Sequence, residues 1–397
     1  MRQKLNAIFL LAGTAIGSGM LSLPIILSKI DTIPMVILML IFTALTYFSA
    51  IVRAELNFQS SASNSLEGIS LLFSGPKVAW ISKVSIRLLF FALLSAYIYG
   101  LSDILSVQLK VSPRLMMCCI ACAVFALLAY SEKLLLLLNR WLFAALLVVV
   151  LVIMLIMAAH VDRSILLVPT RRSVHLGDLT IIAPILFTSF GFHGTIPSVT
   201  KLCRNDVRIV KLACLWGSVI PACVYTIWTA SSLCLLKSRV PEQFQNLASG
   251  SVNLGEFIAT LSNITNLPII GTIIWVIATL AIVTSIFGVG LSLVDDLQAQ
   301  RSQNHHARIL ICGITIIPPL LIAIIVPNAF IQVLAFAGLL LVVIAFLVPT
   351  FLFFKAKIFQ RAFIKCLRYK STGIILMLSG IAIATLECIN LLRHWFS

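Results

Sequence analysis

The sequence predicts an all-α polytopic membrane protein with about eleven transmembrane helices. Of its 397 residues 60% are hydrophobic and only 11% are charged, whereas an ordinary soluble domain carries about 25% charged residues. The surplus apolar surface therefore has to face lipid. The apolar residues also form separate runs of about 20, the length that an α-helix needs to cross a bilayer. None of these runs shows the short alternating segments of a membrane β-barrel.

Eleven segments have the length and the apolar character of a membrane span. They cover residues 7–27, 34–54, 82–106, 114–130, 141–160, 180–199, 211–235, 269–292, 308–326, 329–351 and 372–392. The first segment follows Arg2 and Lys4 as a signal peptide would, but it is longer than a signal sequence and has no A-x-A cleavage site. We therefore expect it to be the first span. Amphipathic stretches near 64–73 and 254–265 are expected to lie at the membrane interface.

The distribution of Lys and Arg predicts the orientation. A net charge of +16 would indicate a nucleic-acid partner in a soluble protein, but here the basic residues lie in short loops between apolar runs. Basic loops favour the cytoplasmic side, and the loop 355–370 is the most basic. We expect a cytoplasmic N-terminus and an external C-terminus in a bacterial inner (plasma) membrane, although the basic loop 163–172 goes against this rule. The lipid bilayer is a partner, and nucleic acid is not.

Glycine and proline interrupt two of the eleven segments. Residues 13–24 read G-T-A-I-G-S-G-M-L-S-L-P, and residues 189–197 read S-F-G-F-H-G-T-I-P. A glycine in a helix interior costs about 1 kcal/mol relative to alanine, and a proline about 3 kcal/mol. One interruption opens spans one to five and the other opens spans six to ten, an arrangement typical of transporters with inverted repeats. Residues 1–397 should form one transmembrane transporter domain, with repeats at about 7–160 and 180–351 and an extra helix at about 372–392.

Interrupted helices at membrane depth are tolerated where their backbone lines a cavity. The N–H groups at the start of a half-helix attract an anion, and the carbonyls freed by the break attract an ammonium group or a cation. A site with both suits a zwitterionic amino acid. Gly13 and Gly17 also have the spacing of a helix-packing motif, but a matching interruption in each half favours a binding site.

Two motifs are too specific to be generic membrane patterns. They are G-x-G-M-L-S-L-P at residues 17–24 and S-F-G-F-H-G-x-I-P-S at residues 189–198. With these motifs, the segments Gly13–Leu27, Glu55–Gly68, Phe187–Lys201, Thr284–Asp296 and Pro327–Pro349 resemble the hydroxy/aromatic amino acid permease family, in particular its tryptophan- and tyrosine-specific permeases. The resemblance implies the amino acid–polyamine–organocation superfamily and its five-plus-five inverted-repeat (LeuT-like) fold, with helices 1 and 6 broken. It also implies import of tyrosine or tryptophan by proton symport.

The resemblance further implies which residues bind the substrate. They are Ala15, Ile16, Gly17, Ser18 and Gly19 of the first break, Ser189, Phe190, Gly191, Phe192, His193 and Gly194 of the second, and Tyr97 of the third span. Asp103 departs from the family pattern, in which a small residue occupies this place. We expect Asp103 to be solvated near the outer mouth.

The driving ion has two candidates. Ionisable residues at membrane depth are costly and mark functional sites, so His193 and Glu55 are candidates for proton coupling. Histidine in particular exchanges a proton near neutral pH. A hydrogen-bonded structural histidine and an interfacial glutamate are the alternatives.

A cation site is the second candidate. Ala281, Thr284 and Ser285 form an A-x-x-[ST]-[ST] spacing that resembles the sodium site of related transporters. Gly13 and Ile16 would add carbonyls from the first span, and hard cations accept such oxygen ligands. Hydroxyls in a helix, however, often bond to their own backbone.

Other functions find little support in the sequence. It contains no H-E-x-x-H motif, nucleophile elbow or phosphate-binding loop, so we expect no enzyme, no cofactor and no resident metal. A channel would need a ring of polar residues around a pore. Within the carriers, the alternatives are a sodium-coupled symporter and a carrier of another small neutral amino acid.

Overall fold

The computed structural model describes residues 2–60, 65–130, 132–160, 175–264, 268–298, 305–326 and 328–396. Within these ranges the chain is helical apart from short connections, and it contains no strand. The predicted loop 163–172 lies outside the described residues. The all-α prediction is therefore confirmed for the part of the chain that is described.

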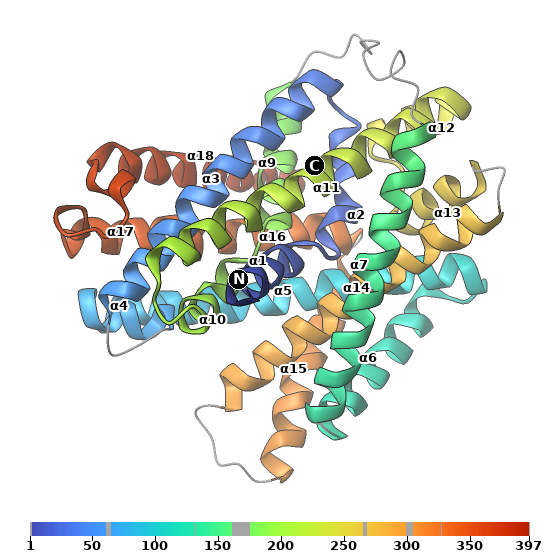
Figure 1. Cartoon of the computed structure of the whole chain (residues 1–397). Coiled ribbons are helices and arrows are strands. Elements are labelled where there is room, and N and C mark those ends of the chain that lie inside the picture. Colours follow the sequence, from blue (N-terminus) through green and yellow to red (C-terminus); the bar gives the residue numbers. More distant parts are fainter. Residues whose placement is uncertain are drawn as a thin grey trace.

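The helices follow one another in the order shown in Figure 1. They are α1 (Arg2–Ala15), α2 (Gly19–Leu27), α3 (Thr32–Gln59), α4 (Leu66–Ser74), α5 (Pro76–Leu109), α6 (Pro113–Tyr130), α7 (Glu132–His160), α9 (Leu176–Ser189), the 3₁₀ turn η1 (His193–Thr195), α10 (Ile196–Leu202), α11 (Val207–Arg239), α12 (Pro241–Ser249), α13 (Leu254–Ile264), α14 (Pro268–Gln298), α15 (His305–Ile325), α16 (Ala329–Val342), the π-helical turn η2 (Val343–Leu347), α17 (Val348–Lys355), the 3₁₀ turns η3 (Ile358–Gln360) and η4 (Lys365–Arg368), and α18 (Lys370–Phe396).

Nine helices in the described ranges are long and apolar enough to cross a membrane, and α1 with α2 makes a tenth if the bent pair is one span. These ten coincide with ten of the predicted segments. The remaining segment, 141–160, falls in α7, whose apolar part Leu137–Ile153 is shorter. The amphipathic stretches predicted near 64–73 and 254–265 correspond to α4 and α13, two short helices that both pack against α5. The protein is an integral membrane protein.

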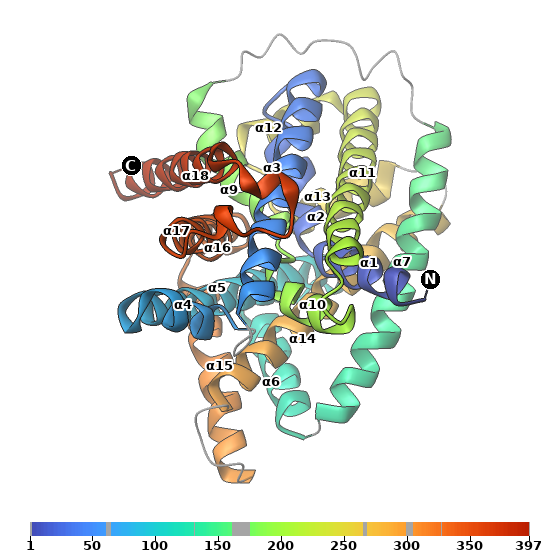
Figure 2. The same cartoon turned by 60° about the vertical axis from the view of Figure 1, so that its left-hand side comes forward.

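The interrupted segments run through the middle of the bundle (Figure 1). There α1 packs against α11, and α2 packs against α9 and α11. The long helix α5 passes beside them and contacts α14, α15 and α16. The last helix, α18, lies at the flank of the bundle against α9 and α16 (Figure 2). The interrupted helices α1, α2 and α9 are therefore surrounded by other helices of the bundle.

Both predicted interruptions coincide with changes in the helices. α1 ends at Ala15 and α2 begins at Gly19, and the two axes are bent by 52°. α9 ends at Ser189, and helical structure returns only at η1. The two interruptions touch at Gly19, where an added Cβ would lie 2.9 Å from the Cα of Ser189. Only glycine allows this close approach of two backbones.

Candidate functional site: a cavity between the interrupted helices

A cavity of about 580 Å³ lies where the interrupted segments meet. Its volume is typical of a site for a small molecule. The interrupted segments contribute residues 13–19, Thr188, Ser189, Gly191 and residues 193–195 to its wall. The rest of the wall comes mainly from α5 and α14, with Arg53 from α3, two residues each from α7 and α16, and further residues from the start of α4 and from η2.

Hydrogen bonds to α14 hold the first interruption in place. The backbone N–H of Ser18 donates to Oγ of Ser285 at 3.1 Å. Oγ of Ser285 in turn donates to the carbonyl of Ala281 at 2.7 Å. A backbone group released by the end of α1 is thus satisfied by a side chain of another helix, as buried polar groups require.

A tyrosine joins the two interruptions. The hydroxyl of Tyr225, on α11, lies 2.6 Å from the carbonyl oxygen of Ala15 and 2.6 Å from that of Ser189. The side chain is completely buried. Because a phenol hydroxyl has one hydrogen, it donates to one carbonyl at a time and can alternate between the two. No motif marks Tyr225 in the sequence; the only available signal was that a buried tyrosine hydroxyl requires a partner.

His193 stands at the cavity wall in the second interruption. Its Nε2 lies 2.5 Å from Oγ of Ser49 on α3, and its ring stacks on that of Phe192 with 5.3 Å between centroids. Nδ1 is buried and has no hydrogen-bond partner among the described residues. Arg53, also on α3, lines the same cavity and lies within electrostatic range of His193. The sequence motifs did not single out Arg53.

Most of the predicted binding residues line the cavity. They are Ala15, Ile16, Gly17, Ser18, Gly19, Tyr97, Ser189, Gly191, His193 and Gly194. Tyr97 reaches the site from α5. Phe190 and Phe192 are fully buried outside the cavity wall. The ring of Phe190 packs edge-on against Tyr225 at 5.2 Å, and Phe192 supports His193 from behind.

Comparison of the sequence with known proteins identifies the family of this chain. Residues 1–387 match the tryptophan/tyrosine permease family. The chain belongs to this family. The resemblance predicted from the two motifs is therefore confirmed, and the protein is a permease.

Related permeases cover most of the chain. The tyrosine-specific transport system 1 of Haemophilus influenzae is 28% identical over 372 residues, which are 90% of this chain and 89% of the relative. The tryptophan-specific transport protein of Pseudomonas aeruginosa is 28% identical over 87% of this chain and 84% of its own. The low affinity tryptophan permease of Escherichia coli is 27% identical, with 88% and 86% covered.

Among solved structures, a manganese transporter from Eremococcus coleocola is similar in fold. It superposes with a TM-score of 0.59 at 16% identity and covers 97% of this chain and 85% of its own. This likeness shows a LeuT-like fold for the permease and nothing about its substrate. Within the described ranges of the permease, no three His, Cys, Asp or Glu side chains are grouped so that they could hold a metal ion.

Glu55, the second candidate for proton coupling, lies away from the cavity. It is completely buried and accepts hydrogen bonds from the backbone N–H groups of Phe363 at 3.0 Å and Ile364 at 3.1 Å. Gln59, one turn further along α3, donates to the same carboxylate at 3.0 Å. Glu55 thus fastens the connection between α17 and α18 to α3.

The residues of the candidate cation site are also gathered. Gly13, Ile16, Thr284 and Ser285 line the cavity. Ala281 lies one turn before Ser285 on α14, and its carbonyl accepts hydrogen bonds from Thr284 at 3.2 Å and from Ser285 at 2.7 Å. Both hydroxyls therefore bond to their own helix, as hydroxyls in membrane helices commonly do.

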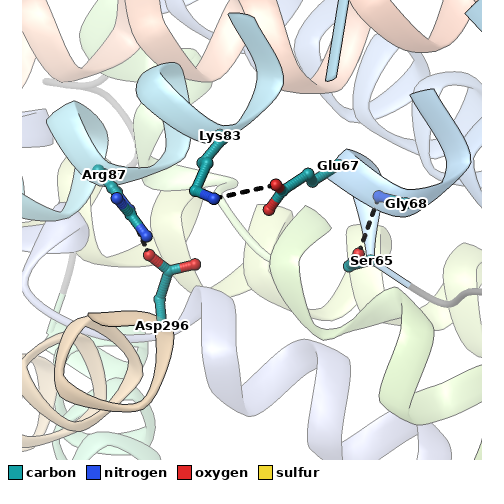
Figure 3. A network of polar contacts seen from close by, with 6 residues as sticks. All are labelled: Ser65, Glu67, Gly68, Lys83, Arg87 and Asp296. Carbon is teal, nitrogen blue, oxygen red and sulfur yellow. Dashed lines mark hydrogen bonds and ion pairs between the residues drawn. The ribbon is translucent and has the colours of Figure 1, made fainter. Parts of the chain in front are cut away.

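Two ion pairs join α5 to its neighbours α4 and α14 (Figure 3). Lys83 of α5 pairs with Glu67 of α4 at 3.1 Å, and Arg87, one turn further, pairs with Asp296 of α14 at 2.6 Å. Ser65, which caps the start of α4, is itself part of the cavity wall. Solvent reaches all four charged side chains.

The opposite end of α5 makes a different contact. Oδ2 of Asp103 accepts a hydrogen bond of 2.8 Å from the backbone N–H of Gly255, in the first turn of α13. The prediction that Asp103 is solvated was wrong, since the residue is 9% exposed. The carboxylate is held at the N-terminus of α13, where unpaired N–H groups and the helix dipole favour an anion.

Proposed function

We propose that the permease is a secondary active transporter that imports an aromatic amino acid, tyrosine or tryptophan, by proton symport and alternating access. The observation that carries the proposal is the cavity of about 580 Å³ at the meeting point of the interrupted helices. It combines released backbone groups, which suit an α-amino acid, with an apolar wall. The names of the tyrosine- and tryptophan-specific relatives supply the substrate class.

The substrate's two charged groups would bind at the interruptions. The start of α2 at Gly19 lines the cavity, and a helix N-terminus stabilises a carboxylate. Carbonyls released between residues 13 and 19 would accept the ammonium group. The side chain would lie against α5, whose Leu89, Phe90 and Leu93 line the cavity at helical spacing.

The cavity extends from the interruptions along the second half of α1 to the start of α4. Its wall includes Phe9 in the middle of α1 and Leu66 at the start of α4. With the cytoplasmic N-terminus expected from the basic loops, this end faces the cytoplasm. The structure would then be inward-open, and its two repeats, residues 7–160 and 180–351, would rearrange to open the other side.

A competition experiment tests the substrate. Uptake of labelled tryptophan and labelled tyrosine is measured in vesicles with each of the twenty amino acids as competitor, once with a protonophore and once without sodium. The proposal expects competition by aromatic amino acids, loss of accumulation with the protonophore and no dependence on sodium. Sodium dependence would favour the sodium-coupled alternative.

A specific relative supports the alternative of another neutral substrate. The glutamine transporter 2 of Aliivibrio fischeri is 26% identical over 86% of this chain and 86% of its own. If glutamine competes and aromatic amino acids do not, the permease carries a small neutral amino acid.

His193 is the proposed proton-coupling group because it lines the cavity and its Nδ1 is buried without a partner among the described residues. His193→Ala should abolish uphill accumulation while exchange of labelled for unlabelled substrate persists. Ser49→Ala is the matched control, since it removes the hydroxyl beside Nε2 and keeps the imidazole. Unchanged uphill uptake in His193→Ala would exclude His193 as the coupling group.

A further inference from the structure

Gly288 is a helical glycine that faces open space. It lies in α14, and a Cβ added to it would meet no atom within 4 Å. At many other helical glycines of this chain a neighbour lies within 3 Å of the added atom: at Gly338 it is the carbonyl oxygen of Pro184 at 2.4 Å, and at Gly217 it is Leu11 at 2.6 Å. Close packing requires glycine at those positions, and it does not at Gly288.

The helix itself gains nothing from a glycine at this position. Glycine in a helix interior costs about 1 kcal/mol relative to alanine, and Gly288 has no positive φ angle that would call for it. The open space beside it is part of the binding cavity, since Gly288 is one of the residues of the cavity wall. What glycine provides here is therefore volume inside the cavity.

The distance of Gly288 from the interruptions corresponds to the length of a long amino acid side chain. It follows Ser285, which binds the backbone of Ser18, by three residues, or about 4.5 Å along the helix axis. An amino acid held at the interruption by its α-amino and α-carboxyl groups would reach the level of Gly288 with a long side chain and not with a short one. On α5, which packs against α14, Leu89 and Leu93 add apolar wall to the same cavity.

We propose that Gly288 determines the size of the substrate side chain that the permease accepts, by leaving room for an aromatic ring. This inference rests on the proposed function, because it assumes that an amino acid occupies the cavity. A larger residue at 288 would fill the space of the ring and leave the backbone contacts at the interruptions intact. It should therefore change the preference among substrates, and not the ability to transport.

The experiment measures uptake efficiency, as the initial rate divided by substrate concentration below saturation, for tryptophan, tyrosine, valine and serine. Wild type, Gly288→Ala and Gly288→Leu are compared at equal amounts in vesicles. Gly313→Ala is the matched control, because Gly313 lies within α15, its added Cβ would come no nearer than 3.9 Å to another atom, and it does not line the cavity. Melting temperatures of the purified variants verify folding.

One methyl group in an apolar pocket changes selectivity by about 10- to 200-fold. We expect Gly288→Ala to lower the tryptophan-to-valine efficiency ratio by at least about 10-fold, Gly288→Leu to lower it further, and Gly313→Ala to leave it unchanged. An equal loss for all substrates, or unchanged ratios in a folded variant, would overturn the inference. If wild type takes up no aromatic amino acid, the proposed function fails. In that case the same efficiency ratio is measured between the substrate that wild type does carry and analogues of it with shorter side chains, and an unchanged ratio in Gly288→Leu overturns the inference.

Discussion

Tyr225→Phe removes one oxygen atom from the point where the two interrupted helices meet. The ring remains, so its edge-on contact with Phe190 at 5.2 Å is kept. The hydroxyl that lies 2.6 Å from the carbonyls of Ala15 and Ser189 is lost. Tyr225 is fully buried, so a replacement donor can come only from water in the cavity, whose wall includes Ala15 and Ser189.

The energetic effect follows from this count of bonds. Leaving a buried acceptor without a donor lowers the stability of the folded state by about 1–3 kcal/mol, which exceeds the net contribution of an ordinary hydrogen bond. Only one of the two carbonyls can accept from Tyr225 at a time, so the loss corresponds to one unsatisfied group and not two. A change of about 1–3 kcal/mol corresponds to roughly 5- to 150-fold in an equilibrium constant.

The assay compares Tyr225→Phe with Tyr130→Phe, a control whose ring is 82% exposed. We expect a lower melting temperature of purified Tyr225→Phe in detergent and a reduced uptake rate in vesicles, because the interruptions lose their common anchor. Tyr130→Phe should match wild type in both measurements. The reasoning is refuted if Tyr225→Phe melts and transports like wild type, since the carbonyls of Ala15 and Ser189 would then be satisfied without the hydroxyl.

Two further predictions concern carboxylates outside the cavity. Asp103→Ala removes the acceptor for Gly255 N–H, and loss of such a cap costs about 0.5–2 kcal/mol. Hydrogen exchange in α13 should then accelerate by up to about 30-fold; unchanged protection of α13 would contradict the capping role. Glu55→Gln weakens the bonds to the N–H groups of Phe363 and Ile364, so it should lower stability by about 1–3 kcal/mol and keep proton-driven accumulation per folded molecule. Loss of accumulation with intact exchange would instead identify Glu55 as a coupling group.

The positions of the helices could be predicted because lipid leaves few choices. Every backbone group in the hydrocarbon core must be bonded within the protein, so each long apolar run has to be a helix. Glycine and proline in residues 13–24 and 189–197 locate the interruptions for the same reason. The positions of Ala15, Gly19 and Ser189 in the cavity wall follow from these interruptions.

The side chains that complete the site could not be predicted in this way. At residues 190–192 the chain is not helical, so the 3.6-residue periodicity that assigns faces does not apply there. Phe190 and Phe192 were expected to bind substrate, and they pack outside the cavity wall. Tyr225 and Glu55 depend on partners that are distant in sequence, and a single sequence gives no information about such pairs. Their roles become visible only when α11 and the α17–α18 connection are placed.

The two amphipathic stretches show how the fold distinguishes the two ends of the molecule. In the proposed repeats they occupy corresponding places, since α4 follows the second predicted span and α13 follows the seventh. Both are fastened to α5, α4 through Lys83 and α13 through Asp103, 20 residues or about 30 Å apart along the helix.

The two fastenings differ in strength for a physical reason. The ion pair at α4 is open to solvent, its side chains being 21% and 40% exposed, and exposed pairs contribute about 0–1 kcal/mol. The carboxylate at α13 is buried against a helix N-terminus, where such a cap contributes about 0.5–2 kcal/mol. Of these two contacts the one with α13 is therefore the stronger, and the start of α4, with Ser65 and Leu66, belongs to the cavity wall.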